Sequence, residues 1–437
     1  MPPRTPDDAG RTARLATHAL IALAGIALLV LAFAWHPVGD YHAESDFYGG
    51  YAEGAKLLMR GHLDPARYPV VGPVYELTLA GLGLTGADLF ALAKWLSVIA
   101  ACATLAFAAA IVRRRSGAVP ALWLTALIAV NPVFMRYGYS ATTDMLALAL
   151  GLATLCWLIA PRGGPTARLN ARAADRARAD QTRDLLIAGL LAALATLTRY
   201  SNVLLVPFGL VALTLWPRQG LTRGAAIGRF LAGFAILAVP WTAHSLVHRL
   251  VPGAPLLRYF SFYASASPDR SIQDLAPAVP DSLKHYQSLG HLLVRDGPGF
   301  FWRTLLNVPR HLMFDARDLI GLPAALLAVV GFMLAAVARS SRGFAPLWIA
   351  GLLQLVLLAP VFHSPRYALP LIPVELSVAA LALAWPWILT TRPRGRARGR
   401  ELAQWTAMIA GITTLTLSAI ASVKEQREVR SLLPTEV

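Results

Sequence analysis

The sequence predicts an all-α integral membrane protein with about eleven transmembrane helices. Of its 437 residues, 56% are hydrophobic and only 15% are charged, whereas a soluble domain carries about 25% charged residues. Apolar runs recur from one end of the chain to the other, which excludes a soluble protein with a single anchor. The two cysteines, Cys102 and Cys156, lie within apolar runs, which favours packing over a disulfide or a metal site.

Each predicted span is an apolar run near the length that a bilayer requires, roughly 20 residues and sometimes as few as about 17. The segments 184–199 and 203–217 are short, and they could form a bent or re-entrant pair. The first span is expected to be an uncleaved signal anchor. The predicted spans are 15–35, 87–112, 118–135, 143–160, 184–199, 203–217, 226–246, 319–338, 344–362, 367–390 and 402–421.

The distribution of basic residues supports this topology. With a cytoplasmic N-terminus, the inner segments contain Arg113–Arg115, six arginines within 162–183 and five within 392–400. All inner segments together carry the whole formal net charge of +16, as the positive-inside rule expects. A further span at 70–84 would place Arg113–Arg115 outside, so this apolar segment is expected on the membrane surface. The charge therefore reports topology and does not indicate a nucleic-acid partner.

Two long outer loops, 36–86 and 247–318, interrupt the spans, and loops of this length are usually functional. The first is expected to contain an amphipathic helix over 45–60, and the second an interfacial helix over 298–318. The expected organisation is a cytoplasmic N-terminal tail (1–14), a polytopic catalytic domain (15–421) and a charged C-terminal tail (422–437).

Polar residues gather in four clusters, all at the outer ends of predicted spans. Ionisable residues at membrane depth are costly and are therefore candidates for function. Each also has a structural alternative, because carboxylates can cap helices, arginines can reach lipid headgroups and a histidine can pack. The clusters are His42–Tyr48, Asn131 with Arg136, Tyr137 and Asp144, then Arg199–Asn202, and finally His363–Tyr367.

The residue types in these clusters fit chemistry on a lipid-linked phosphate. A carboxylate can act as general base for a hydroxyl or amine nucleophile. Arginines can bind a phosphate bidentately and with permanent charge. A phosphate carried by a membrane lipid would explain why these groups lie at the surface of one leaflet.

The order and spacing of these residues resemble the C-type (GT-C) membrane glycosyltransferases, in particular family 39, the protein O-mannosyltransferases and lipid A aminoarabinose transferases. The resemblance covers most of residues 15–390. One departure is that Asp46 stands alone after Ser45, with Glu44 two positions earlier and no adjacent acidic pair. The matching segments are Glu44–Tyr48 with Ala52–Leu58, Gly86 and Lys94, Asn131-Pro132 with Asp144, Gly189–Arg199, and His363–Tyr367 with Pro370 and Pro373.

The resemblance implies an enzyme of the bacterial inner membrane that uses a polyprenyl-phosphate-linked sugar on the extracytoplasmic face. It implies Asp46 as the base, with Glu44 as the alternative, and inversion at the anomeric carbon. The acceptor would be a glycan, a lipid or a protein. The expected substrate-binding residues are Tyr48, Lys56, Lys94, Arg136, Asp144, Arg199, His363, Arg366 and Tyr367.

Two other functions stay open. A transporter or flippase for a lipid-linked sugar would place ionisable residues near the bilayer midplane, where the predicted spans have almost none. An O-antigen-ligase-like transferase would centre on one large late outer loop, as 247–318 could be. No cofactor is expected, although Asp46, Glu44 and His363 could in principle hold a divalent cation.

Overall fold

Helices make up the regular structure of the computed structural model, which describes residues 6–36, 44–159, 171–218, 220–254, 289–337, 344–361, 363–389 and 397–431. The helices are α1 (Pro6–Val30), α2 (Ala52–Met59), α3 (Val74–Gly83), α4 (Leu89–Ser116), α5 (Ala118–Ala129), α6 (Pro132–Tyr139), α7 (Asp144–Ile159), α8 (Ala171–Thr198), α9 (Leu205–Leu215), α10 (Arg223–Val247), α14 (Leu289–Phe314), α15 (Leu322–Val337), α16 (Ala345–Leu358), α17 (Pro365–Ala368), α18 (Ile372–Leu389) and α19 (Ala397–Ser431).

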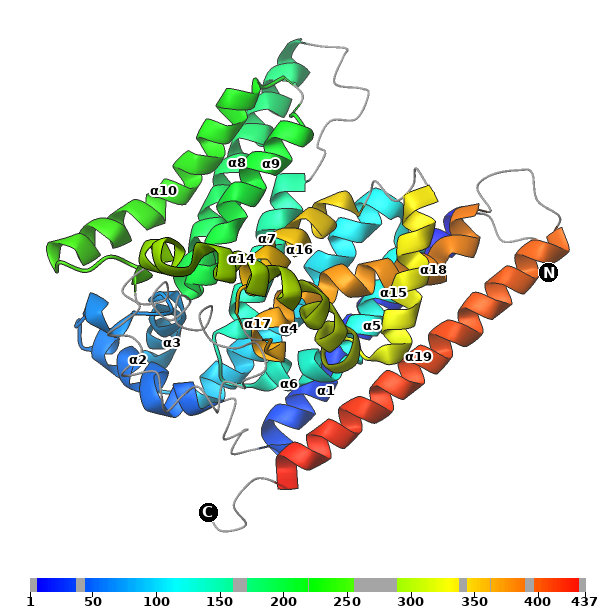
Figure 1. Ribbon diagram of the computed structural model, residues 1–437, viewed down its shortest axis with the longest axis horizontal. Coiled ribbons are helices and arrows are strands. Elements are labelled where there is room, and N and C mark those ends of the chain that lie inside the picture. The colour runs from blue at the N-terminus through cyan, green and yellow to red at the C-terminus, as the bar shows by residue number, and fades with distance from the viewer. Residues whose placement is uncertain are drawn as a thin grey trace.

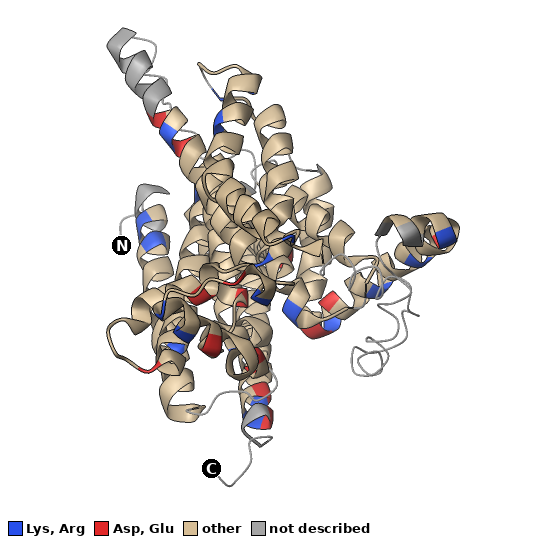
Figure 2. Cartoon of the chain, turned by 90° about the vertical axis from the view of Figure 1, so that its left-hand side faces the viewer, with Lys and Arg blue, Asp and Glu red and all other residues tan. Residues whose placement is uncertain are grey.

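The chain is a multi-pass membrane protein, and each predicted span overlaps helical structure in the described residues. In the part of the chain that the structure describes, five segments are long and apolar enough to cross a bilayer, namely Gly10–Trp35, Leu89–Ser116, Arg223–Val247, Pro365–Ile388 and Glu401–Glu428. Among the described residues a bent pair, α5 with α6, gives a sixth, and α7, α15 and α16 are shorter apolar helices. The number eleven therefore stays a prediction. Figure 2 shows the bundle largely without charge between charged groups at its two ends.

A bend falls within the predicted span 118–135, between α5 and α6, while the bent or re-entrant pair of 184–199 and 203–217 stays a prediction. The axes of α5 and α6 differ by 69°. Asn131 has an extended backbone, and its Oδ1 accepts a hydrogen bond from the Phe134 amide at 2.8 Å. Pro132 opens α6 because its ring suits the first helical turn and cannot continue α5. After this break, α6 contacts α17.

Helices α8 and α10 pack closely and stand together in the upper part of Figure 1. Glycines allow this approach, because a Cβ at Gly189 would lie 2.0 Å from the Phe230 carbonyl oxygen. A Cβ at Gly233 would likewise lie 2.2 Å from the Leu186 carbonyl oxygen. The packing fixes the outer end of α8, where Arg199 follows.

The first long loop, 36–86, contributes a small helical layer in which α2 and α3 pack together (Figure 1). Within the predicted helix 45–60, a π-helical turn over Phe47–Tyr51 precedes α2. Helix α3 is short and is not among the candidate spans, as expected for 70–84. At Gly72 the loop meets α8, since a Cβ there would lie 2.1 Å from the Leu197 carbonyl oxygen.

Three arginines of the predicted cytoplasmic face cap the end of α7. The Nη2 of Arg115 donates to the Ile159 carbonyl at 2.7 Å, and the Nη2 of Arg218 donates to the Leu158 carbonyl at 2.6 Å. Arg114 donates to the Cys156 carbonyl at 3.2 Å. These bonds satisfy carbonyl groups that have no partner within the helix.

Helix α14 crosses the front of the bundle in Figure 1, and α19 runs along its lower right edge. Helix α14 bends at Asp296 and is followed by a π-helical turn over Asp315–Leu319, which together cover the predicted interfacial helix 298–318. Helix α19 continues to Ser431, so most of the expected tail 422–437 is helical. The middle of the second outer loop, 255–288, lies outside the described residues.

Candidate functional site

Two carboxylates and two arginines, one from each of the four predicted clusters, meet at the end of the bundle that the sequence predicts to face outward. The Nε of Arg366 donates to Asp144 Oδ2 at 2.9 Å, and its Nη2 donates to Asp46 Oδ2 at 2.6 Å. Arg199 pairs with the other oxygen of Asp144, Oδ1. The four formal charges balance, so the site is neutral as it stands.

Asp46 is the exposed member of this group. It precedes the π-helical turn over Phe47–Tyr51, and its backbone is already helical. Its side chain makes no capping hydrogen bond, and 44% of that side chain is exposed. The predicted alternative role as a helix cap therefore does not apply to Asp46.

Asp144 is the buried member, with only 3% of its side chain exposed. It begins α7, where a carboxylate also interacts favourably with the helix dipole. Burying a carboxylate is costly unless it is paired and hydrogen-bonded, and both oxygens of Asp144 meet a guanidinium. Arg199 and Arg366 are thus held from separate elements by one carboxylate.

The two arginines stand at breaks in helical structure, which orient them toward the same place. Arg199 follows α8 with an extended backbone, and Ser364 adopts a similar conformation just before α17, which carries Arg366. The ring of Tyr367 links the two, because the Arg199 guanidinium carbon lies 5.6 Å from its centroid. This arrangement is a cation–π contact, worth about 0.5–2 kcal/mol in proteins.

Tyr51 is a residue of this site that the sequence did not single out. It is buried on the turn after Asp46, and its ring packs edge-on against Tyr75 with centroids 5.1 Å apart. Burial raises the pKa of Tyr51 to about 12, and the nearby Asp46 carboxylate adds to this rise. The sequence showed it only as an apolar position of an amphipathic helix.

Glu44 and Lys94 are buried next to the site and bind the backbone. Glu44 Oε1 accepts a hydrogen bond from the Ala141 amide at 2.7 Å, which fixes the segment between α6 and α7. The Lys94 ammonium donates to the carbonyl oxygens of Ala32, at 3.0 Å, and of His36. These bonds join the first span to the second.

The remaining predicted residues lie farther out or bind other elements. Tyr48 is 54% exposed, and its ring stacks on Phe90 with centroids 5.3 Å apart. Burial of part of the ring raises the pKa of Tyr48. Lys56 is exposed near the end of α2, and Arg136 pairs with Glu425 of α19 at 3.4 Å.

His363 does not join Asp46 and Glu44 in a cation site. Its Nε2 lies 2.8 Å from Asp315 Oδ1, on the turn that follows α14. Within the described part of the chain, no three side chains of the metal-ligating types gather where an ion could sit.

An apolar pocket with a cavity volume of about 70 Å³ opens one helical turn below the charged group. Hydrogen bonds connect its rim to the site. Asn202 lines the pocket, and its backbone N–H donates to the Arg199 carbonyl at 2.9 Å. Gln354 also lines the pocket, and its side-chain Nε2 donates to the Tyr367 carbonyl at 3.3 Å. The apolar lining includes Leu148, Leu152, Leu205, Phe208, Leu353 and Val374.

Comparison with known proteins relates the chain to solved structures. No protein-family model matches the sequence, and no curated protein matches it. The apo oligosaccharyltransferase of Archaeoglobus fulgidus superposes with a TM-score of 0.57 and 15% identity, over 93% of this chain and 56% of that one. ArnT from Cupriavidus metallidurans, bound to undecaprenyl phosphate, gives 0.52 and 15%, over 94% and 73%. This chain has the GT-C fold.

The GT-C fold confirms the fold class that the sequence predicted. The archaeal oligosaccharyltransferase in complex with zinc and sulfate is also similar, with a TM-score of 0.52 and 14% identity, over 93% of this chain and 53% of that one. This chain therefore spans just over half the length of the archaeal enzyme. At these identities the likeness establishes the shared fold, and the activity is argued from the site.

Proposed function

We propose that this protein is a glycosyltransferase that moves a sugar from a polyprenyl-phosphate donor to a cell-envelope acceptor. The observation that carries the proposal is the convergence of Arg199, Arg366, Asp144 and Asp46 above an apolar pocket. Such a site offers cations for a phosphate, a carboxylate for a proton and an apolar surface for a lipid chain. The ArnT structure, which contains undecaprenyl phosphate, supports the same ligand class.

The donor phosphate would bind Arg366 and Arg199. Arg366 presents a planar guanidinium, whose geometry suits bidentate binding of phosphate oxygens. Asp144 would hold both arginines in place while the phosphate replaces the contact to Asp46. The first isoprene units would enter the pocket lined by α7, α9, α16 and α18 from the lipid side.

Asp46 would act as the general base. Its carboxylate takes the proton of an acceptor hydroxyl while the acceptor oxygen bonds to the anomeric carbon. The bond between that carbon and the phosphate oxygen breaks, and the polyprenyl phosphate leaves with its new charge beside the two arginines. The nucleophile attacks opposite the leaving group, so the configuration inverts.

The structure favours Asp46 over Glu44 as this base. Asp46 is nearly half exposed and touches Arg366, whereas Glu44 is fully buried and occupied by the Ala141 amide. An acceptor can reach a carboxylate only where that carboxylate is exposed. We assign Glu44 to the support of the segment before Asp144.

The proposal includes an orientation of the site relative to the membrane and the bounds of the catalytic domain. The charged group lies at the end of the bundle opposite the arginines that cap α7, which the positive-inside rule places in the cytoplasm. The site would then face the periplasm of a bacterial inner membrane, within a catalytic domain of residues 15–421. The tails at 1–14 and 422–437 would take no part in the chemistry.

A transfer assay on the purified protein in nanodiscs tests the proposal. A panel of radiolabelled polyprenyl-phosphate sugars is offered with membrane extract as acceptor, to wild type, Asp46→Asn and Glu44→Gln. Transfer that disappears in Asp46→Asn establishes the transferase and its base. Transfer that survives in Asp46→Asn but fails in Glu44→Gln moves the base to Glu44.

The two alternatives give different results in the same assay. A transporter or flippase would bind a donor without transferring the sugar under any condition. An O-antigen-ligase-like enzyme would use a diphosphate-linked donor in place of the monophosphate-linked one. Either outcome would contradict the proposed function.

A further inference from the structure

The turn that carries Arg366 is attached to the end of α14 by a cluster of buried side chains. Helix α17 is a single turn, too short to fix its own position, because isolated helices of this length are unstable. The residues just before it bond to the last part of the second outer loop, namely α14 and the π-helical turn that follows it. The position of Arg366 therefore depends on contacts made outside α17.

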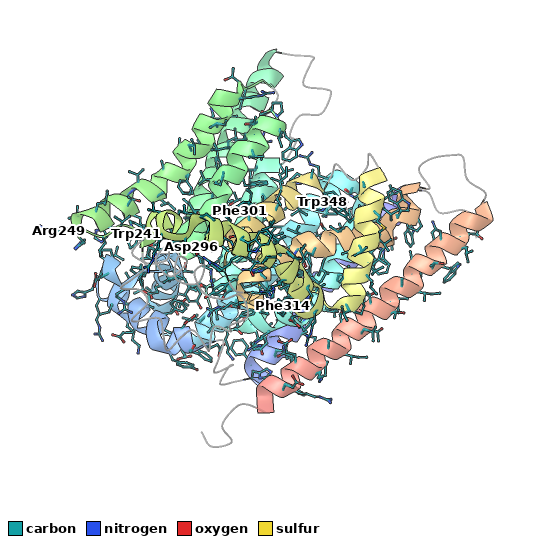
Figure 3. All side chains as sticks on the ribbon, viewed as in Figure 1. Trp241, Arg249, Asp296, Phe301, Phe314 and Trp348 are labelled. Atoms are coloured by element: carbon teal, nitrogen blue, oxygen red, sulfur yellow. The ribbon has the colours of Figure 1, made fainter. Side chains whose placement is uncertain are left out.

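His363 and Asp315 form the central contact of this cluster. The His363 Nε2 lies 2.8 Å from Asp315 Oδ1, and both side chains are almost wholly buried. The ring of Phe314 stacks on His363 with centroids 5.3 Å apart and planes 26° from parallel. Figure 3 marks Phe314 near the lower end of α14, against the bundle.

Two further bonds extend this attachment on either side. The His311 Nε2 lies 2.9 Å from the Val361 carbonyl oxygen, so α14 also holds the chain just before His363. Burial lowers the pKa of His311, which favours the neutral ring. The Nδ2 of Asn131 donates to the Leu319 carbonyl at 2.7 Å, which ties the same π-helical turn to α6.

Apolar packing would have attached the two segments at lower cost. A buried carboxylate is expensive to desolvate, and Asp315 also lies beside the partly buried carboxylate of Glu375, which interacts with it. A directional bond fixes a position more closely than an apolar contact does. The segment 363–366 bears the arginine whose placement between Asp46 and Asp144 requires such accuracy.

We propose that Asp315 and His363 are positioning residues, which hold Arg366 where it can bind the donor phosphate. This inference rests on the proposed function. Neither residue touches the substrate. The hydrogen bond between them fixes the position of the first residue of α17, and α17 in turn fixes the position of the Arg366 guanidinium. The position of Arg366 therefore depends on the position of α14.

Binding of radiolabelled undecaprenyl phosphate to the full chain in nanodiscs tests the inference. Asp315→Asn and His363→Leu should each weaken binding about tenfold, equal to about 1.4 kcal/mol. His363→Gln should retain most of the affinity, since its amide can still donate to Asp315. The matched control is Asp318→Asn, on the same turn with a partly exposed side chain, which should bind as wild type does.

A double-mutant cycle separates positioning from general stability. In an Arg366→Ala background, Asp315→Asn should change the dissociation constant less than about twofold, because its effect passes through Arg366. An equal loss in both backgrounds, or equal losses in His363→Gln and His363→Leu, would overturn the inference while leaving the proposed function intact. Absence of binding by wild type would instead contradict the proposed function, and the inference with it.

Discussion

The guanidinium of Arg366 lies between Asp46 and Asp144, with hydrogen bonds of 2.6 Å to the first carboxylate and 2.9 Å to the second. The two carboxylates differ in exposure, so they hold the arginine differently. Asp144 is buried and paired on both oxygens, whereas Asp46 is open to incoming molecules. A phosphate that reaches Arg366 would therefore compete with Asp46 and not with Asp144.

This competition predicts that Asp46→Asn binds the lipid phosphate more tightly than wild type while losing turnover. A neutral amide competes less strongly for the guanidinium, and the affinity for undecaprenyl phosphate should rise about threefold to tenfold. Titration of the lipid phosphate into nanodiscs measures it. Glu53→Gln, a change at an exposed carboxylate of α2, should leave both affinity and turnover unchanged. Equal or weaker binding by Asp46→Asn would contradict the competition.

Replacing Asp144 by alanine should destabilise the protein and weaken donor binding together. The change leaves Arg199 and Arg366 without the carboxylate that orients them, and breaking a buried pair in this way costs about 3–5 kcal/mol. Thermal unfolding in detergent measures the first effect, and lipid-phosphate binding measures the second. An unchanged unfolding temperature would show that Asp144 is not the anchor of the two arginines.

Glu76→Gln should stabilise the first outer loop at neutral pH. Glu76 is buried against Tyr68, whose hydroxyl donates to its Oε2 at 2.7 Å. Burial raises the pKa of Glu76, so the folded state binds more protons than the unfolded chain above the ordinary pKa of a glutamate. Stability from this group is therefore fully present at low pH and is lost as pH rises through the raised pKa.

The glutamine variant has no such proton to lose and can still accept the bond from Tyr68. Its unfolding temperature should exceed that of wild type by a few degrees at most at pH 8, and the difference should vanish near pH 4. Thermal unfolding at a series of pH values checks this. A difference that does not change with pH would show that the titration of Glu76 is not its cause.

Gly54→Ala should disturb the same loop, because α2 and α3 meet at this glycine. A Cβ at Gly54 would lie 1.8 Å from Glu76 Oε2, so the carboxylate or the helix must move. We expect a loss of transfer activity, since the shift displaces the layer that carries Asp46. Gly49→Ala is the control, because a Cβ there meets nothing within 4 Å. Equal activities of the two variants would argue that the contact between α2 and α3 does not affect the position of Asp46.

The sequence was sufficient to predict the helices and the four clusters that meet in the site. Long apolar runs are local signals, and the arginines that follow the positive-inside rule set which helix ends face the same way. Asp46, Asp144, Arg199 and Arg366 could therefore be placed on one face before their contacts were known. The ion pairs among them could not be predicted, because they depend on the distances between helix ends, which the packing of the helices determines.

The sequence could not distinguish buried residues that support the site from accessible residues that could bind or react with the substrate. Glu44 and Lys94 carry the same charges as site residues, yet both bind backbone groups next to the site. Asp315 lay within the predicted interfacial helix 298–318, and its partner His363 is 48 residues away. The turns Phe47–Tyr51 and Asp315–Leu319 are π-helical, a departure from regular helical periodicity that hydrophobic spacing does not reveal.

The three arginine caps on α7 have an electrical consequence at the opposite end of that helix. Helix α7 has 16 residues and is therefore about 24 Å long, and it begins at Asp144. Its backbone dipole places a partial positive charge at the site and a partial negative charge at the far end. Arg114, Arg115 and Arg218 neutralise the negative end. An anion that approaches Asp144 thus meets the positive pole of a helix whose opposing pole is largely cancelled.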